Sequence, residues 1–190
     1  MKKITILLSL ASFFFAPQLL FAQHKLAQPN EPDGIQWMSF EEAVKKNEKE
    51  QKKIFVDVYT SWCGWCKRLD ATTFKDPKVV EYINKKFHPV KLDAETKDTI
   101  VFRDHQFYYH PDSRTNELAY SMMSGAGRMS YPTAIYLDET FSVLSPVPGY
   151  LTPDQIMPIL MYFGENIYKT KKWEEYVNEL NSQGGAAGNK

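Results

Sequence analysis

The chain has 190 residues, of which 43% are hydrophobic, and its 23 basic residues balance its 23 acidic residues. A formal net charge of zero, without a polybasic stretch, argues against nucleic acid and against an anionic membrane surface as partners. The length predicts one domain with a single sizeable core, and two cysteines are too few for a disulfide scaffold.

The N-terminus has the pattern of a secretory signal peptide. Lys2 and Lys3 precede an apolar run that ends at Pro17, which predicts that residues 1–22 are removed by cleavage near Ala22. An uncleaved membrane anchor is the alternative, although a transmembrane helix needs about 20 apolar residues and the run is shorter. We therefore expect a periplasmic or secreted protein with no membrane contact after signal cleavage.

Three further segments follow the signal peptide. Residues 23–34 are polar, contain two prolines and predict a flexible leader. Residues 35–182 show no internal repeat and no linker, so they predict one folded domain. The Gly/Ala/Asn-rich residues 183–190 predict a disordered tail.

Capping signals and apolar patterns predict the elements of this domain. Ser39 and Glu42 form a capping box, which predicts a helix over 40–51. Residues 54–59 are apolar on both faces, as in a central strand that is covered on each side. Further helices are expected to start at the cysteines and at residue 77, and to cover residues 116–123, 153–163 and 173–180. One more strand is expected over 90–93. Two hairpins are expected, one that pairs 99–102 with 106–109 and one that pairs 133–137 with 141–144. This order favours an α/β fold, a mixed central sheet flanked by helices.

Cys63 and Cys66 are spaced two residues apart directly after the predicted central strand. At the N-terminus of a helix, unpaired amides and the helix dipole stabilise the thiolate of Cys63. Residues three apart lie on one helix face, so Cys66 can attack Cys63 once a mixed disulfide has formed. The pair predicts thiol–disulfide exchange, with Cys63 as the exposed attacking thiol and Cys66 as the buried resolving thiol.

Other uses of a cysteine pair fit less well. A structural staple would close a loop so short that it removes little chain entropy. Two cysteines supply half of a tetrahedral zinc site, and the four histidines show no ligand-pair spacing. Haem attachment needs a histidine where Lys67 stands. We therefore expect no metal and no cofactor beyond the redox-active Cys63–Cys66 disulfide.

Two more residues call for an explanation. Asp57 is a carboxylate in an apolar strand, which costs several kcal/mol unless the group is paired, hydrogen-bonded or protonated. It is a candidate general base for Cys66, and the alternative is a side chain that emerges at the sheet edge.

Pro132 lies between Tyr131 and Thr133 at the start of a strand. A cis peptide bond before Pro132 would explain a proline at this place. The alternative is an ordinary trans proline in a loop.

Residues 55–67, with the motif Trp62-Cys63-Gly64-Trp65-Cys66-Lys67, resemble the active-site segment of thioredoxin-fold proteins. Residues 73–79 look especially like the periplasmic thioredoxin-like domain of the DsbD reductase. The resemblance covers roughly residues 37–163. It implies a thioredoxin fold with an insert before the cis-proline, between Asp93 and Pro132, and an extra C-terminal helix around Trp173.

The resemblance also implies roles for single residues. Cys63 would be the nucleophile and Cys66 the resolving thiol, while Asp57 and Lys91 would be the buried acid and the lysine often paired with it. The substrate groove would be formed by Trp62, Tyr131, Pro132 and Gly149. Tyr108, Tyr109 and His110 of the insert would either frame this groove or cover an edge strand.

The expected function is reduction of protein disulfides, with protein thiol or disulfide substrates and an upstream electron donor as partners. Gly64 and Trp65 stand where thioredoxin has Gly-Pro, and this pair strongly influences the reduction potential. A dithiol oxidase or isomerase therefore stays open. A binding module that uses the groove and leaves the cysteines idle is a further alternative.

Overall fold

The computed structural model describes the chain over residues 34–127 and 129–187. The predicted signal peptide and all but the last residue of the predicted leader lie outside the described residues. Within the described part, no helix combines the length and the apolar character needed to cross a membrane.

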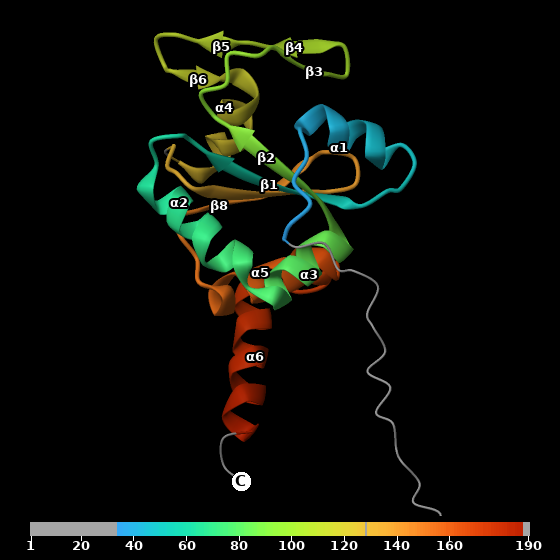
Figure 1. Ribbon diagram of the computed structural model, residues 1–190. Helices are drawn as coiled ribbons and strands as arrows, with labels where there is room; N and C mark the ends of the chain where they lie inside the picture. Colours follow the sequence, from blue (N-terminus) through green and yellow to red (C-terminus); the bar gives the residue numbers. More distant parts are fainter. Residues whose placement is uncertain (1–33, 128, 188–190) are drawn as a thin grey trace, which may run out of the picture. The chain divides into compact units, whose positions relative to one another are not determined.

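A mixed sheet of four strands forms the centre of the domain, as predicted (Figure 1). Its strands lie in the order β2 (Phe87–Asp93), β1 (Lys53–Tyr59), β7 (Thr133–Leu137) and β8 (Val143–Pro148). β1 is parallel to β2 and antiparallel to β7, which in turn is antiparallel to β8. β1 therefore occupies the central position that its apolar sequence predicts.

Helices cover both faces of this sheet. Alternate side chains of β1 point to opposite faces, and apolar side chains on both faces must be covered. Phe55 packs with residues of α2 (Gly64–Ala71), α3 (Pro77–Lys86) and α5 (Pro153–Gly164). Val56 packs on the other side, with residues of α1 (Phe40–Asn47) and α4 (Glu117–Met123). The two apolar clusters lie on opposite faces and together form the core.

The predicted caps of α1 and α3 are present. Ser39 and Glu42 form a capping box at the start of α1, and Asp76 accepts hydrogen bonds from the first amides of α3. α1 ends at Asn47, earlier than expected. The Asn47 side chain accepts from the Lys52 amide at 2.8 Å and donates to the Glu139 carbonyl at 2.8 Å, which turns the chain into β1.

The insert contains two small antiparallel pairs. β3 (Ile100–Phe102) pairs with β4 (His105–Phe107), so the predicted hairpin is confirmed with slightly shorter strands. Its turn is Arg103–Asp104, and both residues have positive φ, as a two-residue hairpin turn requires. The second pair, β5 (Tyr109–His110) with β6 (Thr115–Asn116), was not expected and leads directly into α4.

Both edges of the main sheet carry prolines. β8 has Pro146 and Pro148, and β2 has Pro89, whose carbonyl accepts a hydrogen bond from the Met38 amide at 3.0 Å. β8 starts at Val143 rather than at residue 141, because Asp138 Oδ1 accepts from the amides of Thr140 and Ser142 and lengthens the loop.

The C-terminal part adds a helix to the side of the sheet that α5 covers. α6 runs from Trp173 to Ala187, and its Tyr176 joins the cluster around Phe163. The helix thus continues through residue 187, into the segment 183–190 for which the sequence analysis expects disorder. Three short 3₁₀ turns complete the described elements: η1 (Thr73–Lys75), η2 (Ser124–Ala126) and η3 (Ile167–Lys169).

Candidate functional site

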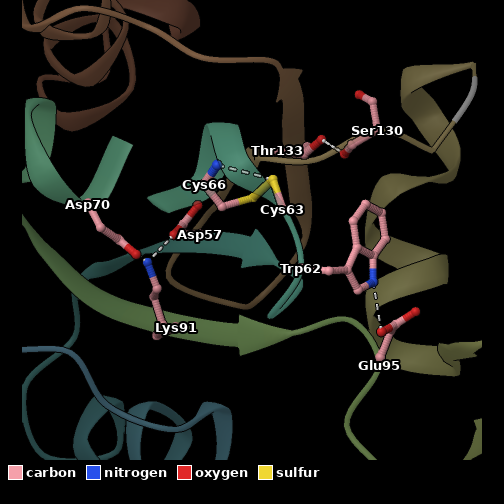
Figure 2. Close-up of a disulfide and its surroundings, with 9 residues drawn as sticks. All are labelled: Asp57, Trp62, Cys63, Cys66, Asp70, Lys91, Glu95, Ser130 and Thr133. Atoms are coloured by element: carbon pink, nitrogen blue, oxygen red, sulfur yellow. Dashed lines mark hydrogen bonds and ion pairs between the residues drawn. A yellow bond between two sulfur atoms is a disulfide. The ribbon is translucent and has the colours of Figure 1, made fainter. Parts of the chain in front are cut away.

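The two cysteines form a disulfide at the start of α2 (Figure 2). Cys63 is the N-cap residue, and its Sγ accepts a hydrogen bond from the Cys66 amide at 3.0 Å. The Cys63 amide donates to the Thr60 carbonyl at 3.1 Å, which holds the turn between β1 and the helix. The helix N-terminus thus offers an N–H donor to the Cys63 sulfur, as the motif predicts.

Both cysteines are buried, and for Cys63 this differs from the expectation. Cys66 is 1% exposed, as expected of the resolving residue, but Cys63 is only 5% exposed. The expectation of an exposed Cys63 is therefore wrong for the disulfide form, in which its Sγ is directed at the Cys66 amide rather than at solvent. The order of burial still agrees with the proposed division of roles.

An ionic cluster lies beside the disulfide. Asp57 and Lys91 face each other in the register of β1 and β2, and the Lys91 Nζ lies 2.6 Å from Asp57 Oδ2. The same Nζ also pairs with the carboxylate of Asp70, four residues after Cys66 on α2. Residues four apart share a helix face, so Cys66 lies on the side of α2 that faces Asp57. Figure 2 shows the three charged side chains grouped next to the disulfide.

Burial dominates the electrostatics of Asp57. The side chain is 1% exposed, which excludes the alternative that it emerges at the sheet edge. Burial raises the pKa of Asp57 to about 6, although the Lys91 ammonium acts in the opposite direction. Burial also disfavours the ammonium of Lys91, but Asp57 and Asp70 outweigh it and raise the pKa of Lys91.

The carboxyl of Asp57 is incompletely satisfied. Its Oδ1 has no hydrogen-bond partner within the described part of the chain. A buried carboxylate with a free oxygen and a pKa of about 6 can accept a proton from a neighbouring group. The geometry is therefore suited to the general-base role that the sequence predicts for Asp57.

Pro132 and Gly149 lie at the end of the sheet from which the chain leads to Cys63. The peptide bond between Tyr131 and Pro132 is cis, and the Gly149 amide donates to the Pro132 carbonyl at 2.8 Å. Gly149 has φ of +99°, a conformation that side chains other than glycine rarely adopt. These residues come from the adjoining ends of β7 and β8, next to the end of β1 that leads to Cys63.

Trp62 links the cysteine motif to the insert. Its ring packs edge-on against Tyr131 at 5.9 Å, and its Nε1 donates to Glu95 Oε2 at 3.0 Å. Glu95 Oε1 lies 3.2 Å from the guanidinium of Arg114. Tyr131 and Glu95, both between Asp93 and Pro132 in the sequence, therefore hold the tryptophan that directly precedes Cys63.

A second aromatic group forms around Trp65, which lies between the two cysteines in the sequence. Trp65 packs against Tyr150 with 5.5 Å between the ring centres. The guanidinium of Arg68 lies 5.3 Å from the Trp65 ring and 5.4 Å from the Tyr150 ring. The Tyr150 hydroxyl is 3.0 Å from Thr72 Oγ1. Tyr150 thus contacts both the first turn of α2, through Trp65, and its C-cap residue, Thr72.

The structure brings the predicted residues to one place, and it adds others. Asp70, Arg68, Glu95 and Tyr150 contact the site but are absent from the sequence prediction. The spacing of Asp70 from Cys66 could have revealed it, whereas nothing in the sequence marks Glu95 or Tyr150. Tyr108, Tyr109 and His110 make their polar and cation–π contacts within the insert rather than with the cysteine motif.

The described residues contain no group of three or more His, Cys, Asp or Glu side chains that could hold a metal ion. The reactive groups that the site does present are the disulfide and the protonatable side chains beside it. These features make the chain a thioredoxin-like thiol–disulfide protein.

Comparison with protein families finds one match along most of the chain. The family model Thioredox_DsbH, described as "Protein of unknown function, DUF255", matches residues 18–180. An uncharacterized protein of Archaeoglobus fulgidus is 33% identical over 101 residues, which is 53% of this chain and 74% of that protein. The thiol:disulfide interchange protein DsbD of Photorhabdus laumondii is 30% identical over 95 residues, 42% of this chain but only 16% of DsbD.

Similar solved structures support the fold. A putative disulphide-isomerase from Bacteroides thetaiotaomicron is 27% identical and has a TM-score of 0.50, covering 75% of this chain and all of that one. A thioredoxin-fold protein from Helicobacter pylori is 16% identical with a TM-score of 0.52, covering 79% of this chain and 89% of that one. The fold is thus the α/β thioredoxin fold, with α6 as an additional C-terminal helix.

Proposed function

The chain belongs to the DUF255 family of thioredoxin-fold proteins, and from this premise we propose that it is an exported thiol–disulfide oxidoreductase that reduces disulfide bonds of other proteins. One observation carries the proposal: the Cys63–Cys66 disulfide caps a helix beside a buried carboxylate with a raised pKa. A structural crosslink would need neither the N–H donor at Cys63 nor a proton acceptor near Cys66.

The reaction starts from the reduced dithiol. The Cys63 thiolate attacks one sulfur of a substrate disulfide, forms a mixed disulfide and releases the first substrate thiolate, which takes up a proton from water. An N–H donor at the Cys63 sulfur, which the Cys66 amide provides in the disulfide form, favours the thiolate that this attack needs. Trp62, Tyr131, Pro132 and Gly149 border the place where the substrate sulfur must lie.

The second step releases the product. Cys66 gives its proton to Asp57, and the resulting thiolate attacks Cys63 Sγ. The Cys63–Cys66 bond forms, the bond between Cys63 and the substrate breaks, and the second substrate thiolate takes up a proton from water while Asp57 returns its proton to solvent. Two electrons have passed from the dithiol to the substrate, and the protein is left in the disulfide form of Figure 2.

Turnover requires an electron donor. A partner dithiol protein would return two electrons and two protons by the same exchange run in the opposite direction. Location in the periplasm or outside the cell is also part of the proposal, since it depends on the predicted signal peptide. Fractionation of cells that make the full chain tests it, and recovery of the uncut chain in the cytoplasm would contradict export.

Reduction of insulin disulfides with dithiothreitol as donor tests the activity. The purified protein should accelerate it, and Cys63→Ser should abolish the acceleration. A reduction potential near that of thioredoxin, about −270 mV, would support the reductase direction. A value near that of DsbA, about −120 mV, would instead make the protein an oxidase.

One observation favours a second candidate, disulfide isomerisation. The Bacteroides thetaiotaomicron structure, of which this chain covers the full length, is titled a putative disulphide-isomerase. An isomerase would restore activity to a scrambled test protein with no net consumption of reductant. A reductase would consume donor in proportion to the bonds that are broken.

A further inference from the structure

Two exposed tryptophans flank the buried disulfide. Trp62 is 60% exposed and Trp65 is 55% exposed, whereas Cys63 is 5% exposed. Trp62 is held by Tyr131 and Glu95, and Trp65 is packed against Tyr150, so both rings are fixed in place. Rigid aromatic rings at the surface supply contact area at low entropic cost, and they are enriched at protein interfaces.

Arg68 is oriented by the aromatic group around Trp65. Its planar guanidinium lies over the Trp65 and Tyr150 rings, at 5.3 and 5.4 Å. A guanidinium carries five N–H donors, so contact with two rings leaves donors that can bind a carboxylate. Arg68 forms no ion pair with any residue in the part of the chain that the structure describes.

The exposed face of α2 is positively charged. Lys67 and Arg68 are both exposed, and the first turn of the helix has no acidic residue. The one carboxylate in the second turn, Asp70, is directed at Lys91. Glu95, which holds Trp62, pairs with Arg114 instead. Among the ion pairs of the described residues, none involves Lys67 or Arg68, so these two exposed cations next to the disulfide are not neutralised.

We propose that Trp65, Arg68 and Tyr150 form a docking platform for an extended, disulfide-bearing segment of a partner protein that carries an acidic side chain close to the reacting cysteine. The proposal rests on the proposed function and names its substrate class. The carboxylate meets the edge of the Arg68 guanidinium, and the neighbouring partner residues cover Trp65. An extended segment fits because only a narrow part of a chain can reach a sulfur as buried as that of Cys63.

Charge complementarity selects this partner over a neutral or basic one. A carboxylate next to Arg68 and Lys67 gains attraction on the α2 side, while a lysine in its place meets two cations. The preference should weaken with added salt, because these groups are at the surface. The effect should lie in binding rather than in the chemical step, since the platform does not contact the Asp57–Lys91 pair.

The test uses short peptides with one cysteine held in a mixed disulfide with a chromogenic thiol, identical except for one residue. Glu, Gln or Lys stands two positions before or two positions after the cysteine. The protein should reduce the best-placed Glu peptide with kcat/KM about three- to tenfold above that of its Gln counterpart, and the Lys peptide more slowly still. Arg68→Gln should remove the preference, and Arg68→Glu should reverse it.

Lys49→Gln is the matched control, because it removes an exposed cation that lies after α1, on the other side of the sheet, and it should retain the preference. Equal kcat/KM for all three peptides in the unmutated protein overturns the platform but leaves the proposed function intact. A preference that persists unchanged in Arg68→Gln also overturns it. Failure to reduce any peptide, or insulin, contradicts the proposed function instead.

Discussion

Lys91 stands directly opposite Asp57 in the parallel register of β1 and β2, and it shares its ammonium between that buried carboxylate and Asp70 at the surface. Asp57 is fully buried, while the Asp70 side chain is 43% exposed. One cation thus connects a hidden carboxyl to one that contacts water. This arrangement leaves Asp57 more basic than an ordinary aspartate, because burial outweighs the charge of Lys91.

The first prediction concerns stability and pH. The pKa of Asp57 rises from its ordinary value of 3.8 to about 6 in the folded protein, so the native state binds a proton more tightly than the unfolded chain. Stability should therefore decrease as the pH rises from about 4 to about 6 and then level off, by on the order of 3 kcal/mol from this group. Asp57→Asn should remove that pH dependence and raise the free energy of unfolding at pH 8, as urea unfolding of the oxidised protein can measure. A variant that is less stable than the parent at pH 8 would contradict it.

Removal of the Lys91 ammonium should destabilise the folded protein at pH 8, whereas Asp57→Asn should stabilise it. Lys91→Met leaves ionised Asp57 buried without its 2.6 Å partner, which should lower the free energy of unfolding at pH 8 by about 3 kcal/mol or more. The loss should shrink at pH 4, where Asp57 is protonated. Lys86→Met is the control, because it removes the surface pair with Glu165 and should cost less than about 1 kcal/mol. Equal losses in the two variants would show that burial of the pair is unimportant.

The roles of the two thiols can be separated by trapping. Cys66→Ser should accumulate a mixed disulfide between Cys63 and its substrate, because no resolving thiol remains, and non-reducing electrophoresis with mass spectrometry detects it. Cys63→Ser should accumulate none. If Cys63→Ser instead trapped substrate through Cys66, the assignment of nucleophile and resolving thiol would have to be exchanged.

Asp57 should also affect the rate of the resolving step. With Asn in its place, Cys66 loses its proton acceptor, and the mixed disulfide should decay about 10- to 100-fold more slowly at pH 7. In the unmutated protein, this rate should rise with pH around the pKa of Asp57, near 6. Single-turnover decay of a preformed mixed disulfide measures it. A rate that is unchanged in Asp57→Asn would assign the proton to another acceptor.

Glu95 should matter for substrate binding rather than for the fold. Glu95→Ala removes the acceptor of the Trp62 N–H group and the partner of Arg114. KM for insulin should rise about fivefold, which corresponds to the loss of one hydrogen bond of about 1 kcal/mol. Glu117→Ala, which removes the His110 contact elsewhere in the insert, should leave KM unchanged. A similar rise in both variants would indicate a general effect of the insert.

Local signals in the sequence were sufficient for most of the fold. Ser39 and Asp76 cap helices through contacts that lie within four residues, so their effect can be read without knowledge of the tertiary structure. The apolar run before Cys63 likewise predicted the central strand. The second pair of the insert, β5 with β6, was missed because strands of two residues show no periodicity.

The site was only partly predictable, for a physical reason. Asp57 stands out because a charge in an apolar strand needs a partner, and Asp70 lies one helical turn from Cys66. Glu95 reaches Trp62 across 33 positions of sequence, and Tyr150, which follows β8, contacts Trp65 on α2, so neither leaves a local pattern. The low exposure of Cys63 is also a tertiary property, which the helix-cap motif alone does not determine.

The prolines of the outer strands have a consequence for the solubility of the folded domain. Pro146 and Pro148 on β8, and Pro89 on β2, lack the N–H group that a foreign strand would need as a donor. Met38 additionally occupies the β2 edge through the Pro89 carbonyl and the Lys91 amide. Sheet edges that cannot accept another strand protect a protein against edge-to-edge aggregation. Such protection would keep the domain from pairing strands with the proteins whose disulfides it is proposed to reduce.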